Sequence, residues 1–217
     1  MEFASRWVRQ ERWHLGWQRN AVAGLFGIRF RVRGQQGRGG SLSVAPHAEP
    51  EELTWPDDLP HGQCSGDTGY FGHVGGLLLE QTPDDERALC FDSLQLDGDL
   101  CVVGHAWLRI DVTPGPLPAT FACRMCDAAP DGRAGLVTRT VTNLGLDDDL
   151  NTVRGIASCQ HLHVRVKFPT TAYRFTAGHR IRLALGSSCW PLIWPPDCPA
   201  RSIISSRGAK LSLRLQP

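Results

Sequence analysis

The chain has 217 residues, of which 41% are hydrophobic and 21% are charged, and its formal net charge is +1. This composition excludes a largely disordered chain or a coiled coil, and a charge near zero creates no global field that recruits nucleic acid or membrane. No segment approaches the roughly 20 apolar residues of a membrane-spanning helix, and the N-terminus lacks the apolar core of a secretory signal. We therefore expect a cytoplasmic protein whose eight cysteines are reduced.

Residues 1–47 are predicted to form an irregular N-terminal segment. Trp7, Trp13 and Trp17 lie among arginines, and the glycine-rich tract 34–40 is typical of a flexible connector. This tract neither follows a clear strand nor begins a helix, so it does not indicate a phosphate-binding loop. Arginines and tryptophans together would suit single-stranded nucleic acid. Because the rest of the chain shows no basic surface, we favour a segment that covers an apolar patch on a neighbouring domain.

Residues 48–217 are predicted to form an all-β domain. Residues 46–66 are rich in proline and acidic side chains and are expected to be an extended loop, whereas β patterns begin near Leu89. Polar and apolar side chains alternate in residues 107–112, 162–168, 181–185 and 211–215, which predicts strands with one buried face. In 162–168 the predicted outward side chains are His163, Arg165 and Lys167.

Turn signals separate these predicted strands. They include residues 113–116 and the Pro-Asp-Gly sequence at 130–132, in which proline fixes φ and glycine permits a positive φ. Many short strands separated by glycine and proline, without long amphipathic stretches, are typical of a jelly-roll β-sandwich. The irregular N-terminal segment would then be an extension of that sandwich.

The sequence does not indicate a catalytic site. A serine hydrolase of the α/β type needs a G-x-S-x-G turn between a strand and a helix, and no such pentapeptide occurs. Ser187 and Ser188 follow a predicted strand, but the proline at position 191 disfavours a helix after them. A standalone esterase that uses one of these serines is the least favoured interpretation.

Two short motifs raise the question of a metal site. Cys123 and Cys126 form a C-x-x-C motif, but residues three apart on a strand point to opposite faces, so their sulfur atoms would not converge without a bulge. His161 and His163 share one strand face, but no third ligand is indicated nearby, and Arg165 and Lys167 on the same face would repel a cation. We therefore expect neither a metal nor a cofactor.

Trp190 and Trp194 flank a proline-containing, non-helical segment and suggest an aromatic ridge. Such ridges bind sugars or anchor protein interfaces, while packing within the rim of the sandwich is the alternative. Together with Trp7 and Trp13, they are our candidates for an interface with another domain.

Several segments, in order, resemble the C-terminal non-catalytic domain of the CocE/NonD hydrolases, a family that includes cocaine esterases, α-amino-acid ester hydrolases and X-Pro dipeptidyl-peptidases. The resemblance extends over about residues 5–206, and an Arg/Gly-rich insertion interrupts its beginning. The similar segments are residues 12–16, 40–43, 84–96, 100–104, 107–112, 121–127, 130–132, 136–139, 172–175, 178–183 and 186–195.

The resemblance implies a jelly-roll β-sandwich similar to galactose-binding domains. It also implies an accessory role: the domain would pack against an α/β-hydrolase domain, border its active site and support homo-oligomer contacts. The catalytic Ser, Asp and His of the family belong to that hydrolase domain, so this chain is expected to be inactive alone. The alternative function is a freestanding module similar to carbohydrate-binding domains.

Overall fold

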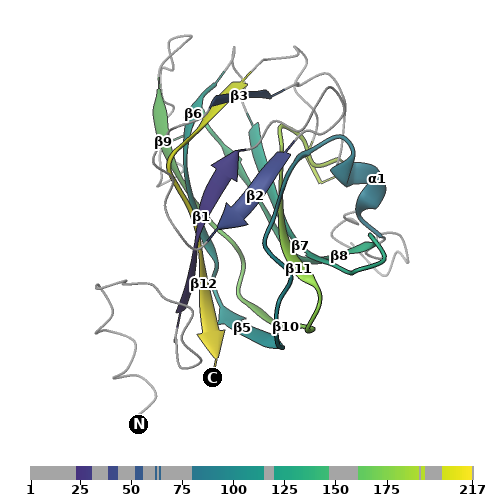
Figure 1. Cartoon of the computed structure of the whole chain (residues 1–217). Helices are drawn as coiled ribbons and strands as arrows, with labels where there is room; N and C mark the ends of the chain where they lie inside the picture. Colours follow the sequence, from purple (N-terminus) through teal and green to yellow (C-terminus); the bar gives the residue numbers. More distant parts are fainter. Residues whose placement is uncertain are drawn as a thin grey trace, which may run out of the picture.

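The structure is a computed structural model that describes residues 23–30, 39–43, 52–55, 62, 64, 80–114, 120–146, 161–190, 192–193 and 202–216. The elements are almost all strands (Figure 1), and among the described residues no helix is long and apolar enough to cross a membrane. The elements, in chain order, are β1 (Ala23–Phe30), β2 (Gly39–Ser43), β3 (Glu52–Trp55), α1 (Thr82–Asp85), β4 (Leu89–Asp92), β5 (Leu100–Gly104), β6 (Trp107–Thr113), β7 (Thr120–Ala128), β8 (Ala134–Asn143), β9 (Leu162–Lys167), β10 (Thr171–Phe175), β11 (Arg180–Gly186) and β12 (Ser202–Gln216).

Strand β12 organises one half of the sandwich. It is 15 residues long and pairs antiparallel with β1, β3, β5 and β6. Strand β9 extends this half by pairing with β6, and β10 pairs antiparallel with β5. A strand of this length can pair with four others because different stretches of it pair with different strands. Its register with β6 shifts between Ser205 and Lys210.

The other half contains β4, β11, β7 and β8, which pair antiparallel in that order. The two halves are connected by β2, which pairs antiparallel with β1 and parallel with β4. The described strands thus form a sheet that bends over itself, and its halves face each other across the core (Figure 1). This arrangement confirms the predicted all-β sandwich.

The core lies between the two halves and consists of inward-facing side chains from strands in which apolar and polar residues alternate. In β9, Leu162, Val164 and Val166 are buried while the residues between them are exposed, as the alternation predicts. The opposing layer contributes further side chains that are fully buried. They include Phe91 of β4, Phe121 and Met125 of β7, and Ile181, Leu183 and Leu185 of β11.

The predicted turn at residues 130–132 connects β7 to β8. Gly132 has a φ of +92°, and its N–H donates to the carbonyl oxygen of Ala129 at 3.0 Å. Glycine therefore stands at a position whose backbone conformation other residues adopt only with strain. Residues 115 and 116 of the predicted turn at 113–116 lie outside the described residues.

The N-terminal part differs from the sequence-based expectation. Strands β1 and β2 lie inside residues 1–47, which were predicted to be irregular, and β3 lies inside the predicted loop at 46–66. Glycines and arginine weaken the alternation of residues 23–30, so the local pattern does not indicate a strand. The partners that make these segments strands, β12 for β1 and β3 and β4 for β2, lie far away in the sequence.

Candidate functional site

The serines that follow β11 do not form a nucleophile elbow. Ser187 is 7% exposed and Ser188 is 3% exposed, and the chain then turns so that the N–H of Ile193 donates to the carbonyl oxygen of Cys189 at 2.9 Å. A Cβ added at Gly62 would lie 2.7 Å from the Cα of Cys189, so a second backbone segment packs directly against this turn. A hydrolase serine instead exposes its Oγ on a sharp turn into a helix.

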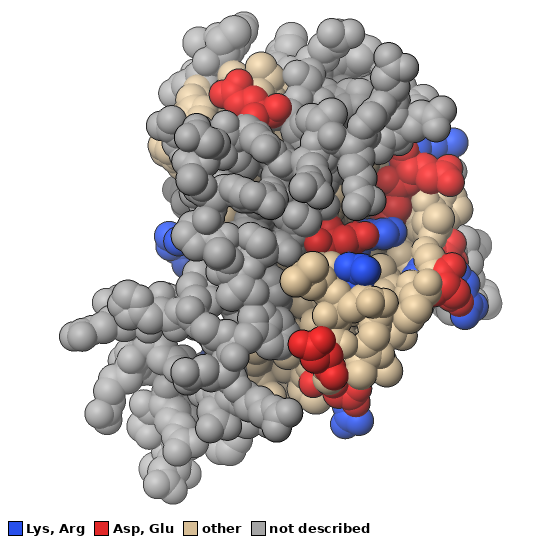
Figure 2. All heavy atoms as spheres, in the orientation of Figure 1, with Lys and Arg blue, Asp and Glu red and all other residues tan. Residues whose placement is uncertain are grey.

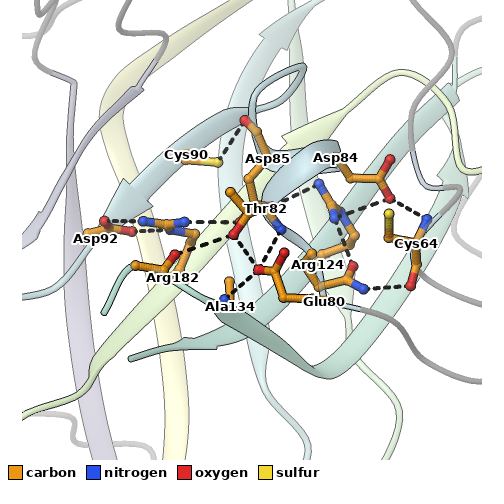
Figure 3. A network of polar contacts seen from close by, with 12 residues as sticks. Cys64, Glu80, Thr82, Asp84, Asp85, Cys90, Asp92, Arg124, Ala134 and Arg182 are labelled. Carbon is orange, nitrogen blue, oxygen red and sulfur yellow. Dashed lines mark hydrogen bonds and ion pairs between the residues drawn. The ribbon is translucent and has the colours of Figure 1, made fainter. Parts of the chain in front are cut away.

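A buried charge network lies on the strands β4, β7 and β11 and on α1 (Figure 3). We define it as Asp84, Asp85, Asp92, Arg124 and Arg182. Arg124, on β7, is 3% exposed and lies 3.0 Å from Oδ1 of Asp85 and 3.7 Å from Oδ2 of Asp84. Asp84 and Asp85 are presented by α1, so this short helix is fixed to the sheet by charge as well as by its backbone.

Arg182 connects the same helix to β4. Its guanidinium donates two parallel hydrogen bonds to Asp92, at 2.7 and 2.8 Å, and a third to Oδ2 of Asp85 at 3.1 Å. Asp85 therefore lies between two arginines, one on β7 and one on β11. Bidentate pairs of this kind are among the strongest hydrogen bonds in proteins and fix the relative position of both partners.

Gln81 extends the buried charge network toward residue 64. Its side chain is fully buried; Oε1 accepts from Arg124 at 2.9 Å, while Nε2 donates to the carbonyl oxygen of Cys64 at 2.6 Å. The N–H of Cys64 in turn donates to Asp84 at 2.8 Å. Both backbone groups of Cys64 thus find partners in side chains distant in the sequence, as buried polar groups must.

The ion pairs of the buried charge network have a structural role, because they hold α1 against the strands. Burial raises the pKa of Asp85, although the two arginines oppose the shift. Burial also raises the pKa of the neighbouring Cys126 and Cys90 thiols, and the carboxylate of Asp85 adds to the effect. Because these cysteines remain protonated at neutral pH, they do not provide a thiolate nucleophile.

The two cysteines of the C-x-x-C motif lie on opposite faces of β7, as predicted. Cys123 is part of the hydrophobic core, whereas Cys126 lies on the face of Arg124 and the buried charge network. The register between β7 and β8 does shift between Met125 and Cys126, but this irregularity does not bring the sulfurs together. Cys64, Cys90, Cys101, Cys123, Cys126 and Cys189 are all free thiols.

A second polar cluster contains an Asp–His pair. Asp127, on β7, accepts from the hydroxyl of Tyr173 at 2.9 Å and lies 2.8 Å from Nδ1 of His179. Burial and the hydrogen bond to Asp127 raise the pKa of Tyr173 to about 12. Asp127 and His179 are paired like the Asp and His of a hydrolase triad. In the described part of the chain, however, no serine or cysteine contacts His179.

The histidine pair has a neighbour that the sequence did not indicate. Asp111 of β6 lies directly opposite His163 of β9 in the antiparallel register. Its Oδ1 is 2.6 Å from Nδ1 of His163, and its Oδ2 is 3.4 Å from Nε2 of His161. The expectation that no third metal-ligating group lies near this pair is therefore wrong, because the strand pairing that brings Asp111 there is a tertiary feature.

The structure describes one of the four tryptophans predicted to form an interface. Trp190 is partly buried in the turn after β11, while Trp7, Trp13 and Trp194 lie outside the described residues. On the face that Figure 2 shows, acidic and basic side chains of the described residues are interspersed, in agreement with the net charge near zero.

Comparison with known proteins identifies a matching family and a related esterase. Residues 5–202 match the family described as the X-Pro dipeptidyl-peptidase C-terminal non-catalytic domain. Cocaine esterase from Rhodococcus sp. (strain MB1 Bresler) is 26% identical over an aligned length of 129 residues, and the match covers 54% of this chain and 22% of the esterase. This chain thus corresponds to a minor part of that relative's length.

Solved structures with similar folds are also longer than this chain. An α-amino acid ester hydrolase superposes with a TM-score of 0.68 at 16% identity, over 89% of this chain and 36% of the hydrolase. A CocE/NonD family hydrolase from Staphylococcus aureus superposes with a TM-score of 0.62 at 10% identity, over 91% of this chain and 37% of that one. These superpositions show a shared fold. Because the family match spans nearly the whole chain, the chain belongs to the X-Pro dipeptidyl-peptidase C-terminal non-catalytic domain family.

Proposed function

We propose that this β-sandwich is an accessory domain of a CocE/NonD-type serine hydrolase. It packs against an α/β-hydrolase domain and borders that domain's active site. The observation that carries the proposal is the match of residues 5–202 to a family of non-catalytic domains. The lengths support it as well, because the chain corresponds to little more than a third of the similar hydrolase structures.

The polar clusters support a role in holding structure rather than in chemistry. Arg124 and Arg182 are neutralised by Asp84, Asp85 and Asp92, so the buried charge network offers no free charge to a substrate. Ser187 and Ser188 are buried, and the recorded partners of His179 do not include a nucleophile. The reacting groups would therefore come from the partner domain.

Trp190 and the three other predicted tryptophans are the proposed contact residues for that partner. Large aromatic side chains dominate the binding energy of interfaces, and Trp190 is only partly buried in this chain. Replacement of Trp190 by alanine is expected to weaken binding to the hydrolase domain by at least about tenfold, or about 1.4 kcal/mol. Titration calorimetry with a CocE/NonD-type hydrolase domain from the same genome measures the effect, and Leu94→Ala, at an exposed site on another loop, is the control.

Activity assays test the non-catalytic assignment. The purified chain is incubated with a p-nitrophenyl ester, with an X-Pro p-nitroanilide and with a fluorophosphonate that labels reactive serines. We expect neither turnover nor label. If a single serine is labelled and the label disappears in Ser187→Ala or Ser188→Ala, the chain is an esterase in its own right and the accessory role is wrong.

A further inference from the structure

Asp111, His161 and His163 form a cluster, here called the Asp–His cluster, on the outward face of β6 and β9. Histidines at positions i and i+2 of an extended strand project from the same face, and the register places Asp111 directly across from the second one. One ligand atom from each of the three side chains lies within 4.8 Å of the others. The rings of the two histidines are 5.2 Å apart and perpendicular.

These distances are close to what a small metal ion requires. Zinc bonds to imidazole nitrogen and carboxylate oxygen are about 2.0–2.2 Å, so tetrahedral ligand atoms lie about 3.3 Å from one another. Oδ2 of Asp111 is 3.4 Å from Nε2 of His161, close to that value, while Oδ1 is 2.6 Å from Nδ1 of His163, a hydrogen bond that a metal ion would replace. The side chains of His161 and His163 are 49% and 82% exposed, so they can adjust by a fraction of an ångström and admit a hydrated ion.

A further hydrogen bond orients one ligand. The hydroxyl of Thr113 lies 3.4 Å from Nδ1 of His161, while Nε2 of the same ring faces Asp111. Metal-binding histidines commonly donate their other ring N–H to an oxygen, which fixes the tautomer that presents the coordinating nitrogen. Thr113 can accept this hydrogen bond at the position where such a partner is needed.

The cations on the same face do not prevent binding. The guanidinium of Arg165 lies 4.2 Å from the centre of the Trp107 ring and the ammonium of Lys167 lies 5.6 Å from it, at the end of the ladder away from His161. Arg109 and Arg165 form the pair next to Asp111 and His163, and solvent screens their repulsion on this exposed face. They would weaken cation binding moderately and favour an anion as an additional ligand of the metal.

We propose that Asp111, His161 and His163 bind one divalent transition-metal ion, with zinc as the representative. Two imidazoles and one carboxylate leave at least one coordination position open for water or for a group from a partner. Nitrogen ligands favour zinc, cobalt, nickel and copper over magnesium and calcium, which prefer oxygen. The ion would join β6 to β9 at the edge of the sandwich, independently of any hydrolase partner.

Cobalt titration of the full, reduced chain tests the site directly. Co²⁺ bound by nitrogen and oxygen gives visible d–d bands without the intense near-ultraviolet charge-transfer band that thiolate ligands produce, so the spectrum distinguishes this cluster from the cysteines. We expect one Co²⁺ per chain, displaced by Zn²⁺ but not by Mg²⁺. Asp111→Asn and His163→Gln should each weaken binding at least about tenfold.

His105→Gln is the matched control, because His105 is a partly exposed histidine that hydrogen bonds to Phe168 and Thr170 away from the cluster. It should leave the affinity unchanged. Circular dichroism checks the fold of each variant, and His163→Gln keeps the test informative because its side chain is mostly solvent-exposed. The proposal would be overturned if the chain did not bind Co²⁺, or if Asp111→Asn and His163→Gln bound it as tightly as the unsubstituted chain. A thiolate charge-transfer band that persists in both variants would also overturn it.

Discussion

Arg124 illustrates how one side chain can fix several segments at once. Its guanidinium contacts Asp84, Asp85 and Gln81, and the side chain is almost fully buried. Desolvation of such a cation is costly, and the surrounding carboxylates offset that cost only while all partners are in place. Removal of the guanidinium is therefore costly, because it leaves two buried carboxylates, Asp84 and Asp85, without this opposite charge.

Replacement of Arg124 by methionine is expected to lower the free energy of unfolding by about 3–5 kcal/mol, the cost of breaking a buried ion pair. Chemical denaturation measures the change. Arg133→Met is the matched control: Arg133 pairs with Asp131 at 2.8 Å, but its side chain is 76% exposed, so the loss should stay below about 1 kcal/mol. Equal effects of the two substitutions would show that the buried charge network does not stabilise the fold.

Tyr173 makes the stability of the fold depend on pH in the alkaline range. Its pKa is raised to about 12 by burial and by the hydrogen bond to Asp127. Because the folded state holds this proton more tightly than the unfolded state, the associated stability is complete below pH 10 and is lost as the pH rises from about 10 to 12. The proton also keeps the hydrogen bond that orients Asp127 toward His179.

Absorbance of tyrosinate during an alkaline titration checks this value, since the chain contains only two tyrosines. We expect one transition near pH 12, before the chain unfolds, and its disappearance in Tyr173→Phe. Asp127→Asn should shift the transition toward pH 10, because the neighbouring negative charge is removed. A titration in which both tyrosines ionise near pH 10 would contradict the assigned environment.

At the scale of elements, the connection between β7 and β8 depends on one backbone conformation. Gly132 adopts a φ of +92°, but a Cβ at this position would meet no atom within 4 Å, so its only penalty is conformational. Gly132→Ala should therefore cost about 1–2 kcal/mol. Gly135→Ala, in β8 and equally open, should cost less than about 0.5 kcal/mol, because its φ is not positive.

Thermal unfolding of the two variants measures this difference. A destabilisation by Gly135→Ala as large as that by Gly132→Ala would mean that an added methyl group, rather than φ, is responsible. The turn was predictable from Pro-Asp-Gly because this chemistry is local. The same reasoning explains why β9 was predicted with its correct buried face: alternation on one strand needs no information from elsewhere in the chain.

At the scale of the whole molecule, the N-terminal strands are part of the sandwich. Strand β1 pairs with β12 and with β2, and β2 pairs with β4 and so joins the two halves. A chain that starts at residue 48, where the sequence-based boundary lay, would lack both strands and expose the edges of β4 and β12. Such unpaired edges promote aggregation.

Deletion of residues 1–47 is accordingly expected to abolish cooperative unfolding or to make the protein insoluble. Deletion of residues 1–22, which retains β1 and β2, is the comparison. Circular dichroism during heating and sedimentation measure the outcome. If residues 48–217 alone unfold cooperatively with an unchanged midpoint, the boundary at residue 47 is a true domain boundary and the two strands are dispensable.

The candidate sites show the limit of local reasoning more clearly than the fold does. His161 and His163 were recognised as one face of a strand, but Asp111 lies 52 residues from His163 and becomes its neighbour only through the β6–β9 pairing. Asp84 and Asp85 are adjacent in the sequence. The arginines that neutralise them lie on β7 and β11, and nothing in the local sequence assigns these partners.

The sequence by itself determined the all-β class, the buried faces of the regular strands, the turn after β7, the absence of a G-x-S-x-G motif and the family. Each depends on alternation, turn chemistry or ordered motifs, which are properties of residues close together in the chain. Only the tertiary structure decided that β1, β2 and β3 are strands, that Arg124 and Arg182 clamp α1, and that Asp111 joins the two histidines. These features depend on pairing between strands distant in sequence, and the burial that makes such pairing favourable exists only in the folded chain.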